Sequence, residues 1–541
     1  MTHPAAPAKS ESEFLPKIVT VWREGYHLAD LHADALAGLT VAIVALPLSM
    51  AIAIASGLGP ERGLFTAIVG GFLVSLLSGS RYQVGGPPGA FIVLVSACVM
   101  QVGIDGLILA TFLSGAMLVV LALFRAGSYV RFIPYPVTLG FTAGIAVIIF
   151  ASQIKDLFGL ALPGPEPAAI LTKLETLWAV RGTVTPQAIA VAAGTVALIV
   201  GIKRIAPLWP NLLIAVGAGA VAVTALNLPV ETIYSRFGAL PRILPAPALP
   251  IITLATLTGA LPWAMSFTML GAIESLLSAV VADGMSGARH RPNAELMAQG
   301  VANMGVALFG GFCVSGTIAR TATNVRAGSR GPVSGMLHAA FILLFMIIAA
   351  PLAGYIPLAS LAGVLTIVAW NMAEKAEIWA LIRNSRADAV VLLVTFLLVV
   401  FRDLSEGIII GFALGGLVFI SRMSDAARID APAAVKGGLP SDVVVYQLHG
   451  PYFFGAAARL GGSLQKIAEQ PKTLVLDVTQ VPYIDSSGAH SFEGLAQKLA
   501  RFGGRLVILG ARPEVRMSLN SAGLKPPLAV YCDSLEGLPQ P

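Results

Sequence analysis

Charge is scarce in this sequence. Only 12% of its 541 residues are Asp, Glu, Lys or Arg, while 56% are hydrophobic and the mean hydropathy is +0.81. Soluble globular proteins carry about 25% charged residues. A water-soluble protein of this length could not hide so many apolar side chains from the solvent. The composition therefore indicates that the lipid bilayer surrounds most of the chain.

Several kinds of functional motif are also missing. The three cysteines, Cys98, Cys313 and Cys532, lie far apart and have the spacing of neither a metal site nor a disulfide framework. No GxxxxGK[ST] loop, HExxH motif or nucleophile elbow occurs, so an ATP-driven pump or an integral enzyme lacks its usual parts. The net charge of +6 comes without a basic-aromatic patch. We therefore expect no enzyme, no cofactor, no metal and no nucleic-acid partner.

What the sequence has instead is long apolar runs. A membrane-spanning helix needs about 20 mostly apolar residues, and the sequence offers fourteen candidate segments in two groups of seven. The first group is 34–56, 62–79, 88–101, 104–124, 135–154, 186–202 and 208–226. The second group is 261–283, 294–311, 317–328, 333–352, 357–371, 387–401 and 405–422. The polar stretch before residue 34 lacks the apolar core of a signal peptide.

Two of these segments, 88–101 and 317–328, are too short to span a bilayer. Each is third in its group, and each follows a glycine-rich break, at Gly85–Gly89 and at Gly310–Gly316. Short, Gly/Pro-interrupted segments at matching positions are typical of inverted-repeat transporters. The pattern predicts a polytopic helical membrane protein of 7+7 spans, with half-helices at spans 3 and 10.

Two half-helix starts that face each other at mid-membrane would make an anion site. Each start offers unpaired N–H groups and the positive end of a helix dipole, which bind anions without a cationic side chain. We expect the following residues to contact a small anion: Gly89, Ala90, Phe91, Gly316, Thr317, Ile318 and Ala319. The alternative is that both breaks are ordinary kinks or re-entrant turns without a ligand.

Two charged residues fall inside apolar segments, where a charge is costly and usually functional. Arg320 would strengthen the positive potential at the anion site; alternatively, it pairs with Glu274 or reaches toward Arg326. Glu274 is interpreted as the only carboxylate well inside a segment. A carboxyl group removed from water can take up and release a proton, and Ser278, one turn later, could instead help it hold Na⁺. The pair predicts proton or sodium coupling.

The positions of Lys and Arg predict the orientation of the chain. These residues are concentrated in the loops after even-numbered segments, so the positive-inside rule places both termini in the cytoplasm. Beyond residue 422, strand-like runs at 443–448, 473–478 and 505–509 alternate with helical runs at 456–469 and 487–501, as in a small α/β domain. The expected domains are a cytoplasmic segment 1–33, a transport domain 34–424, a linker 425–439 and a C-terminal domain 440–541.

Asp485, Ser486 and Ser487 follow a predicted strand of this last domain and open its helix. Asp or Ser at such a junction caps the helix, and a serine at an exposed helix N-terminus is also suited to phosphorylation. These three residues are therefore a candidate regulatory site.

These motifs together resemble the SulP family, also called solute carrier family 26, with a C-terminal STAS domain. The resemblance is carried by Ala45–Ala51, Gly85–Phe91, Gly140–Ile145 and Gly316–Thr321, and in the tail by Val475–Asp477 and Ile484–Gly488. It implies homodimers with a mobile core of spans 1–4 and 8–11, a gate of spans 5–7 and 12–14, and elevator-like transport. It also implies that residues around Ala90 and Thr317 line the site, with Glu274 as coupling acid and Arg320 as its basic residue.

The sequence departs from the family pattern at Pro88, where Ser or Thr is common, and at Leu48, where a polar residue is common. Backbone N–H groups must then carry more of the anion recognition. Sodium-dependent relatives tend to use Asp where this chain has Glu274 and a hydroxyl near Ile318, which favours protons.

The preferred expectation is H⁺-coupled symport of a C4-dicarboxylate (fumarate, succinate or aspartate) across a bacterial inner membrane, because spans 1 and 5 are most similar to bacterial dicarboxylate members. Uptake of sulfate or bicarbonate with Na⁺ or H⁺, or exchange for chloride, is the alternative. Two other classes stay open: a membrane anchor that signals to a regulatory protein or nucleotide through its STAS domain, and a nucleobase permease.

Overall fold

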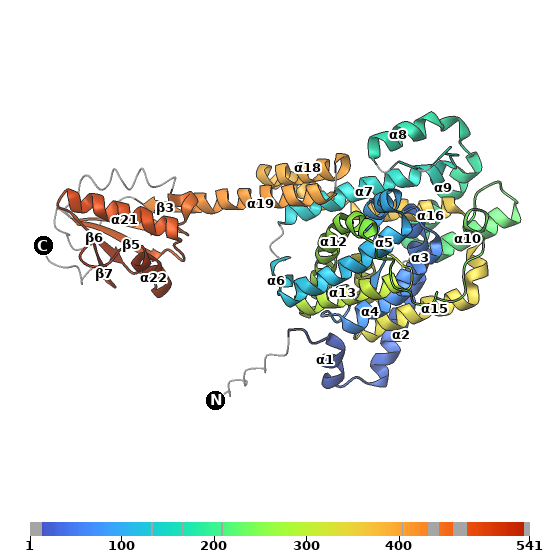
Figure 1. Cartoon of the computed structure of the whole chain (residues 1–541), viewed down its shortest axis with the longest axis horizontal. Helices are drawn as coiled ribbons and strands as arrows, with labels where there is room; N and C mark the ends of the chain where they lie inside the picture. Colours follow the sequence, from blue (N-terminus) through green and yellow to red (C-terminus); the bar gives the residue numbers. More distant parts are fainter. Residues whose placement is uncertain are drawn as a thin grey trace. The chain divides into compact units, whose positions relative to one another are not determined.

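The computed structural model describes residues 13–130, 134–164, 166–167, 169–206, 209–402, 404–430, 443–457 and 473–534 (Figure 1). The chain forms two compact units, Met1–Phe412 and Ala413–Pro541. The boundary between them falls inside one helix, α19 (Leu404–Ala426).

The first unit is almost entirely helical. Its first half contains α1 (Lys17–Glu24), α2 (Leu28–Ala55), α3 (Pro60–Phe65), η1 (Thr66–Gly70), α4 (Gly71–Leu77), η2 (Gly89–Phe91), α5 (Ile92–Leu123), α6 (Gly127–Val130), α7 (Tyr135–Phe158), α8 (Ile170–Ala179), η3 (Arg181–Thr183), α9 (Pro186–Ile205), α10 (Asn211–Ala225) and α11 (Ile233–Phe237). Its second half contains α12 (Leu254–Ser286), α13 (Pro292–Leu308), α14 (Ile318–Arg326), α15 (Val333–Ala353), α16 (Leu358–Met372), α17 (Lys375–Asn384) and α18 (Arg386–Phe401). Within the described residues, eight helices are long and apolar enough to cross a membrane.

A helix coincides with each of the fourteen predicted segments. The third and fourth segments form one element, η2 with α5, which bends at Gly103. The backbone there has φ 71°, a left-handed value that glycine adopts without a steric penalty. The first helix, α2, begins at Leu28 rather than at residue 34.

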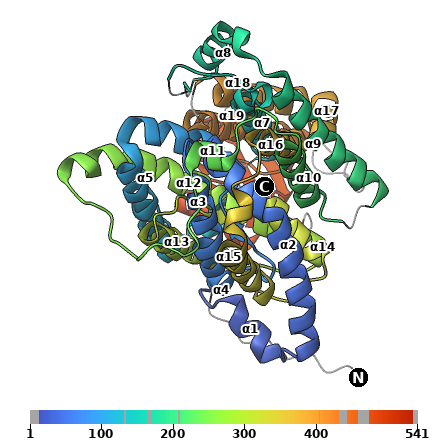
Figure 2. The same ribbon diagram turned by 90° about the vertical axis from the view of Figure 1, so that its right-hand side faces the viewer.

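The helices of the first unit form two groups (Figure 2). In one group α5 lies against α12 and α13, and α2 lies against α14 and α15. In the other group α7 lies against α16 and α18, and α9 against α10 and α16. Fewer contacts, among them those of α2 with α10 and α16, join the two groups.

Two very short strands lie inside the first group of helices. Strand β1 (Gly85–Gly86) precedes η2, and strand β2 (Ser315–Gly316) precedes α14. They pair antiparallel, with Gly85 opposite Gly316 and Gly86 opposite Ser315. The pair therefore joins the two glycine-rich breaks, which are about 230 residues apart in the sequence.

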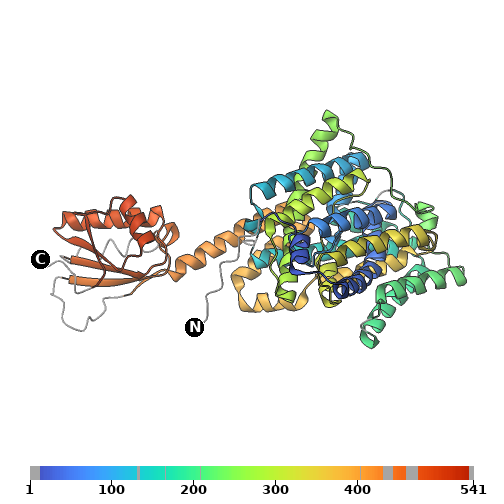
Figure 3. The same cartoon turned by 90° about the horizontal axis from the view of Figure 1, so that it is seen from below.

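The second unit contains a five-stranded sheet in the order β3-β4-β5-β6-β7 (Figure 3). Its strands are β3 (Arg428–Asp430), β4 (Val443–His449), β5 (Thr473–Gln480), β6 (Arg505–Leu509) and β7 (Ala529–Cys532). Strand β3 is antiparallel to β4, and all later neighbours are parallel. Helices α21 (Ser486–Arg501) and α22 (Pro513–Ser521) provide the crossovers after β5 and β6.

Alternation along the strands builds the core of this unit. On β5, Leu474 and Leu476 join the cluster that contains Phe492 of α21, while Val475 between them joins Val445 and Val507 on the other face. This is the pattern of a strand whose side chains alternate between two faces. The three predicted strands agree with β4, β5 and β6 to within two residues.

Parts of the predicted tail fall outside the described residues. These are residues 458–469 of the predicted helix 456–469 and residues 431–439 of the predicted linker. The described part of that linker holds the end of α19 and strand β3.

Candidate functional site

The β1–β2 pair requires glycine on both strands. A Cβ atom added to Gly86 would lie 1.6 Å from Arg320 Nη1, and one added to Gly316 would lie 1.5 Å from Gln83 Nε2. The first glycine makes room for a guanidinium group and the second for an amide. Each break therefore makes room for a polar side chain from the opposite half of the chain.

A helix begins directly after each of these strands, and neither start has a side-chain cap. Pro88 precedes η2, and the hydroxyl of Thr317, which precedes α14, donates to Val84 O at 3.3 Å instead of capping its helix. The first N–H groups of a helix have no intrahelical partner. Two uncapped helix starts, each with a positive dipole end, thus lie on either side of one strand pair.

The strand pair uses two of the backbone donors that were predicted for the anion. Thr317 N donates to Val84 O at 3.1 Å, and Gly316 N donates to Ser275 Oγ at 3.2 Å. The Thr317 N–H thus joins the two breaks, and the Gly316 N–H ties β2 to α12. The remaining donors at the α14 start are those of Ile318 and Ala319, and both residues are at least partly exposed.

At the other start, Gly89 is half-buried and Ala90 is buried. A Cβ atom on Gly89 would lie 3.4 Å from Ile149 Cδ1 of α7 and 3.8 Å from Met372 Sδ of α16. Gly89 thus lies where the two helix groups meet. Phe91 is buried and its ring lies 5.9 Å from that of Phe267, so it packs against α12.

Arg320 extends from the first turn of α14 to the strand crossing. Its Nη2 donates to Ser49 Oγ of α2 at 3.0 Å, and its Nη1 lies 3.4 Å from Gly85 O. The side chain is only 2% exposed. In the described residues Arg320 forms no ion pair with Glu274, so that predicted alternative is absent, and the positive charge is held at the crossing.

Glu274, on α12, contacts the second strand. Its Oε2 accepts a hydrogen bond from Ser315 Oγ at 3.0 Å, and Ser315 is the residue opposite Gly86 in the strand pair. Glu274 is half-buried, whereas Ser275 beside it is completely buried. The carboxyl group therefore contacts the strand crossing directly.

Ser278 has different neighbours from those expected. It is completely buried, and its hydroxyl lies 3.1 Å from both Gln83 Oε1 and Thr321 Oγ1. Ser315, which the sequence did not single out, is the hydroxyl that reaches Glu274. It stands next to Gly316 in the break, but nothing in the sequence shows which way its side chain points.

Gln83 organises the inner side of the crossing and was also missed. Its Nε2 donates to Ser275 O at 2.9 Å, and the residue is 1% exposed. Val84 N, next in the chain, donates to Thr321 Oγ1 at 3.2 Å. The approach to β1 is thereby tied to both α12 and α14.

Comparison with known proteins identifies the family of the chain. Residues 31–395, more than half of the chain, match the sulfate permease family, and residues 438–533 match the STAS domain. The chain belongs to the sulfate permease family. The resemblance to SulP proteins with a STAS tail that the motifs predicted is confirmed.

Relatives in this sulfate permease family cover nearly the whole chain. A putative sulfate transporter of Bacillus subtilis, YvdB, is 41% identical over 508 residues, which are 93% of this chain and 95% of that protein. The bicarbonate transporter BicA of Picosynechococcus is 28% identical over 528 residues, 92% of each chain.

Solved structures share the fold. The murine anion transporter Slc26a9 in the inward-facing state has a TM-score of 0.84 at 16% identity and covers 97% of this chain and 93% of its own. The transmembrane domain of a cyanobacterial BicA has a TM-score of 0.63 at 28% identity and covers 72% of this chain and 98% of its own. The chain is therefore a helical membrane protein of the SLC26 fold with a C-terminal STAS domain.

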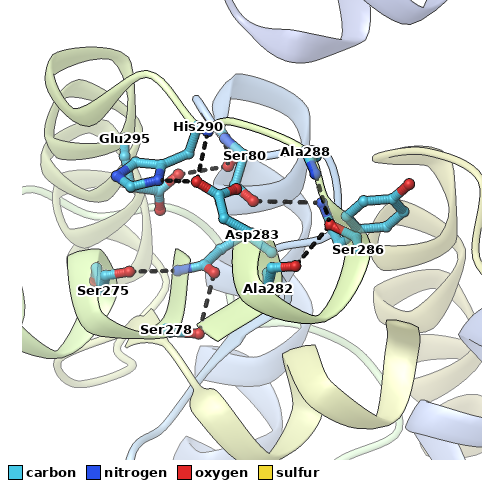
Figure 4. Close-up of polar contacts among 12 residues, drawn as sticks. Ser80, Ser275, Ser278, Ala282, Asp283, Ser286, Ala288, His290 and Glu295 are labelled. Atoms are coloured by element: carbon cyan, nitrogen blue, oxygen red, sulfur yellow. Dashed lines mark hydrogen bonds and ion pairs between the residues drawn. The ribbon is translucent and has the colours of Figure 1, made fainter. Parts of the chain in front are cut away.

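A second polar cluster lies in the sulfate permease domain, where α12 ends and α13 begins (Figure 4). Asp283 Oδ2 accepts from His290 N at 2.9 Å and lies 2.7 Å from His290 Nδ1. Glu295 is completely buried and accepts hydrogen bonds from Ser78 Oγ and Gln299 Nε2. Glu295 lies in the first turn of α13, at the second residue of the predicted ninth segment, so the structure adds a buried carboxylate at the end of a segment.

In the STAS domain, Asp485 caps α21. Its Oδ1 accepts from Gly488 N at 2.7 Å, and its Oδ2 accepts from Phe454 N at 3.1 Å. Ser486 and Ser487 are exposed in the first turn of the helix. Asp485 thus has a structural partner on each oxygen, while the two serine hydroxyls are accessible to a modifying enzyme. Within the described part of the chain, no three His, Cys, Asp or Glu side chains gather to hold a metal ion.

Proposed function

We propose that this protein is a secondary transporter that carries a small oxyanion across the membrane together with a proton. The observation that carries the proposal is the β1–β2 pair, which joins two uncapped helix starts and holds the Arg320 guanidinium beside them. Helix N-termini bind anions through N–H groups and dipoles. A buried cation at the same place adds the charge that selects for an anion.

In this proposal the anion lies between the starts of η2 and α14. Gly89, Ala90, Ile318 and Ala319 supply backbone N–H groups, and Arg320 supplies positive charge. Gly316 and Thr317 serve the site indirectly, because the Thr317 N–H joins the two breaks and the Gly316 N–H ties β2 to α12. Phe91 supports the η2 start through its contact with Phe267.

The proposed topology has fourteen spans in a 7+7 inverted repeat, with η2–α5 up to Gly103 and α14 as the half-helices. A helix of nine residues is about 13 Å long, less than half of a bilayer core of about 30 Å. The packing of the helices into two groups supports a core of spans 1–4 and 8–11 that moves against a gate of spans 5–7 and 12–14. Gly89 lies against the gate helices α7 and α16, as an elevator-like movement requires.

Glu274 is the proposed proton carrier. The residue is half-buried, and its carboxyl group accepts a hydrogen bond from Ser315 of the strand pair that joins the two helix starts. Protonation there can therefore influence the anion site through one hydrogen bond. Ser278 faces Gln83 and Thr321 rather than Glu274, so the Glu274–Ser278 pair that the sodium alternative would use does not form.

Sulfate and bicarbonate are the favoured substrates, because relatives that cover more than 90% of the chain are named as transporters of these anions. The names of the relatives do not support the C4-dicarboxylate expectation. The two helix starts recognise negative charge rather than a carbon skeleton, so a dicarboxylate is tested as a competitor.

Contacts of the N-terminal segment 13–24 support the proposed orientation. Arg291 donates to Thr20 Oγ1 and Leu15 O, Arg81 pairs with Glu24, and Arg125 pairs with Glu13. Basic loops from even-numbered positions thus lie with the N-terminal segment, which supports a cytoplasmic N-terminus by the positive-inside rule. We place the protein in a bacterial inner membrane as a homodimer, with its STAS domain open to regulatory partners.

Proteoliposomes that contain the full-length protein test the proposal. An inside-alkaline pH gradient is expected to accelerate uptake of labelled sulfate, with unlabelled bicarbonate, fumarate and succinate added as competitors. The Glu274→Gln variant should lose this acceleration but retain sulfate exchange, because the anion site is intact. Glu175→Gln, an exposed carboxylate on α8, is the matched control. Uptake that responds to the pH gradient equally in wild type and Glu274→Gln would contradict the coupling role.

A further inference from the structure

Two buried side chains next to the anion site carry polar atoms that no other group bonds. His338, on α15, is 0% exposed, and neither of its ring nitrogens has a partner among the described residues. Arg320 Nε also lacks a partner there, although both terminal nitrogens of the same guanidinium are bonded. A buried polar group without a partner costs about 1–3 kcal/mol, so three such atoms in one region require an explanation.

The two side chains lie close together around one carbonyl group. Gly85 O, which Arg320 Nη1 contacts, would lie 3.1 Å from a Cβ atom on Gly71, and His338 Cδ2 would lie 3.7 Å from the same atom. The imidazole on α15 and the carbonyl that Arg320 contacts therefore both lie beside Gly71 of α4.

The groups around the imidazole are either apolar or already bonded. Helix α2 approaches α15 at Gly38, where a Cβ atom would lie 3.1 Å from His338 N. Ser75 Oγ, on α4, donates to Gln83 O at 3.1 Å. Asp34, one turn before Gly38, accepts from Arg330 N and Gly331 N. None of these groups is bonded to the histidine ring.

The hydrogen-bond donors and acceptors of the two side chains determine which kind of molecule could bond to both of them. A neutral imidazole has one N–H donor and one acceptor nitrogen, and Arg Nε–H is a donor only. An anion would accept from the donors but leave the imidazole acceptor unpaired. A water molecule both donates and accepts, and buried waters typically make about three hydrogen bonds to such groups.

We propose that His338 and Arg320 enclose a buried water molecule. This water bridges the His338 ring to the Nε–H group of Arg320 and so holds the guanidinium in place. Ser49 and Gly85 hold the other two nitrogens. His338 is then a positioning residue: it fixes the direction of the positive charge at the strand crossing without touching the anion. The part of this proposal that concerns transport rests on the proposed function; the water site itself does not.

A cryo-EM map of the full-length protein, at a resolution that shows ordered waters, tests the site directly. Density is expected between His338 and Arg320. A map that shows ordered waters elsewhere in the first unit but none between these two residues would overturn the proposal. This observation needs neither transport nor a substituted protein.

Substitutions test the positioning role. His338→Phe keeps a ring but removes both polar nitrogens, whereas His338→Gln keeps a donor and an acceptor; His32→Phe, at an exposed position of α2, is the control. In His338→Phe the KM for sulfate should rise several-fold with maximal uptake little changed and the Tm lowered, and His338→Gln should restore most of both. If no water is present, His338→Phe removes two buried nitrogens that have no hydrogen-bond partner. The Tm should then be equal or higher and the KM for sulfate unchanged, and this result would overturn the proposal.

These readouts separate the two proposals. If the wild-type protein does not transport sulfate, the proposed function fails. The cryo-EM density between His338 and Arg320, and the Tm values of the wild type, His338→Phe and His338→Gln, still decide whether the water site exists. If His338→Phe does not fold, the His338→Gln variant and the wild-type map decide it: a Gln variant with wild-type Tm and bridging density supports the site, and absent density overturns it.

Discussion

Replacement of Gly86 by alanine would displace the charged group that the anion site depends on. The new methyl group would lie 1.6 Å from Arg320 Nη1 and 2.6 Å from its Cζ. Non-bonded carbon atoms keep about 3.5–4.0 Å apart, so the guanidinium has to move by about 2 Å. Such a movement breaks its contacts with Ser49 Oγ and Gly85 O, which are 3.0 and 3.4 Å long.

The size of the effect follows from the bond to Ser49. A hydrogen bond that involves a charged group contributes about 1.5–3 kcal/mol, which corresponds to about a 10- to 150-fold change in an equilibrium constant. Because the Arg320 side chain is 2% exposed, it cannot exchange the lost bonds for water. We therefore expect Gly86→Ala to raise the KM for the anion at least about tenfold and to lower the Tm.

Two other glycines provide matched controls for uptake assays in proteoliposomes. Gly316→Ala, in the partner strand, displaces the Gln83 amide instead of Arg320, and so should lower the Tm with a smaller change in KM. Gly217→Ala, on α10, meets nothing within 4 Å and should leave transport unchanged, with a Tm equal or slightly higher because alanine favours helix. A Gly86→Ala protein with the KM and Tm of the wild type would refute the role given to the crossing.

Three further substitutions probe other contacts. Ser315→Ala removes only the hydroxyl that reaches Glu274 and should change the pH profile of uptake more than Ser278→Ala does; equal profiles would argue against a direct link. Asp34→Ala leaves the N–H groups of the α14–α15 loop unpaired and should lower the Tm by several degrees, with Asp34→Asn intermediate. Asp485→Ala removes the α21 cap and should cost about 0.5–2 kcal/mol, seen as faster hydrogen exchange across α21 in the full chain, while Asp485→Asn stays close to wild type.

The helices were predictable because a membrane imposes a strong constraint on sequence. Backbone groups in lipid must be satisfied within each helix, so every long apolar run that ends at Gly, Pro or charge corresponds to a helix here. The two glycine-rich breaks were visible for the same reason. The three central strands of the second unit were visible through their alternation of apolar residues.

The pairing of the breaks and the direction of side chains were not predictable. Nothing local connects Gly85 with Gly316, because their pairing depends on the packing of helices far apart in the sequence. Ser315 and Ser278 both lie near Glu274, yet only the folded chain shows that the first contacts it and the second faces Gln83. The spacing of one turn on α12 favoured Ser278 as the neighbour of Glu274. The packing of β2 against α12 instead brings Ser315 to the carboxyl group.

Buried carboxylates at the ends of spans were missed for a related reason. Asp34 and Glu295 stand near predicted helix starts, where charged residues are usually interfacial. In the structure both are 0% exposed. Asp34 accepts hydrogen bonds from Ser329 and from backbone N–H groups that follow it, and Glu295 accepts one from Ser78. Ser329 and Ser78 lie more than 200 residues from Asp34 and Glu295, so these bonds could not be inferred from the neighbouring sequence.

The central claim is that the transported anion binds between the starts of η2 and α14. The most direct test is a structure of the full-length protein with bound sulfate or bicarbonate. We predict density for the anion within hydrogen-bond distance of the backbone N–H groups of Gly89 or Ala90 and of Ile318 or Ala319, with the Arg320 guanidinium still in contact with Ser49. Anion density elsewhere in the sulfate permease domain, with both helix starts empty, would contradict the claim.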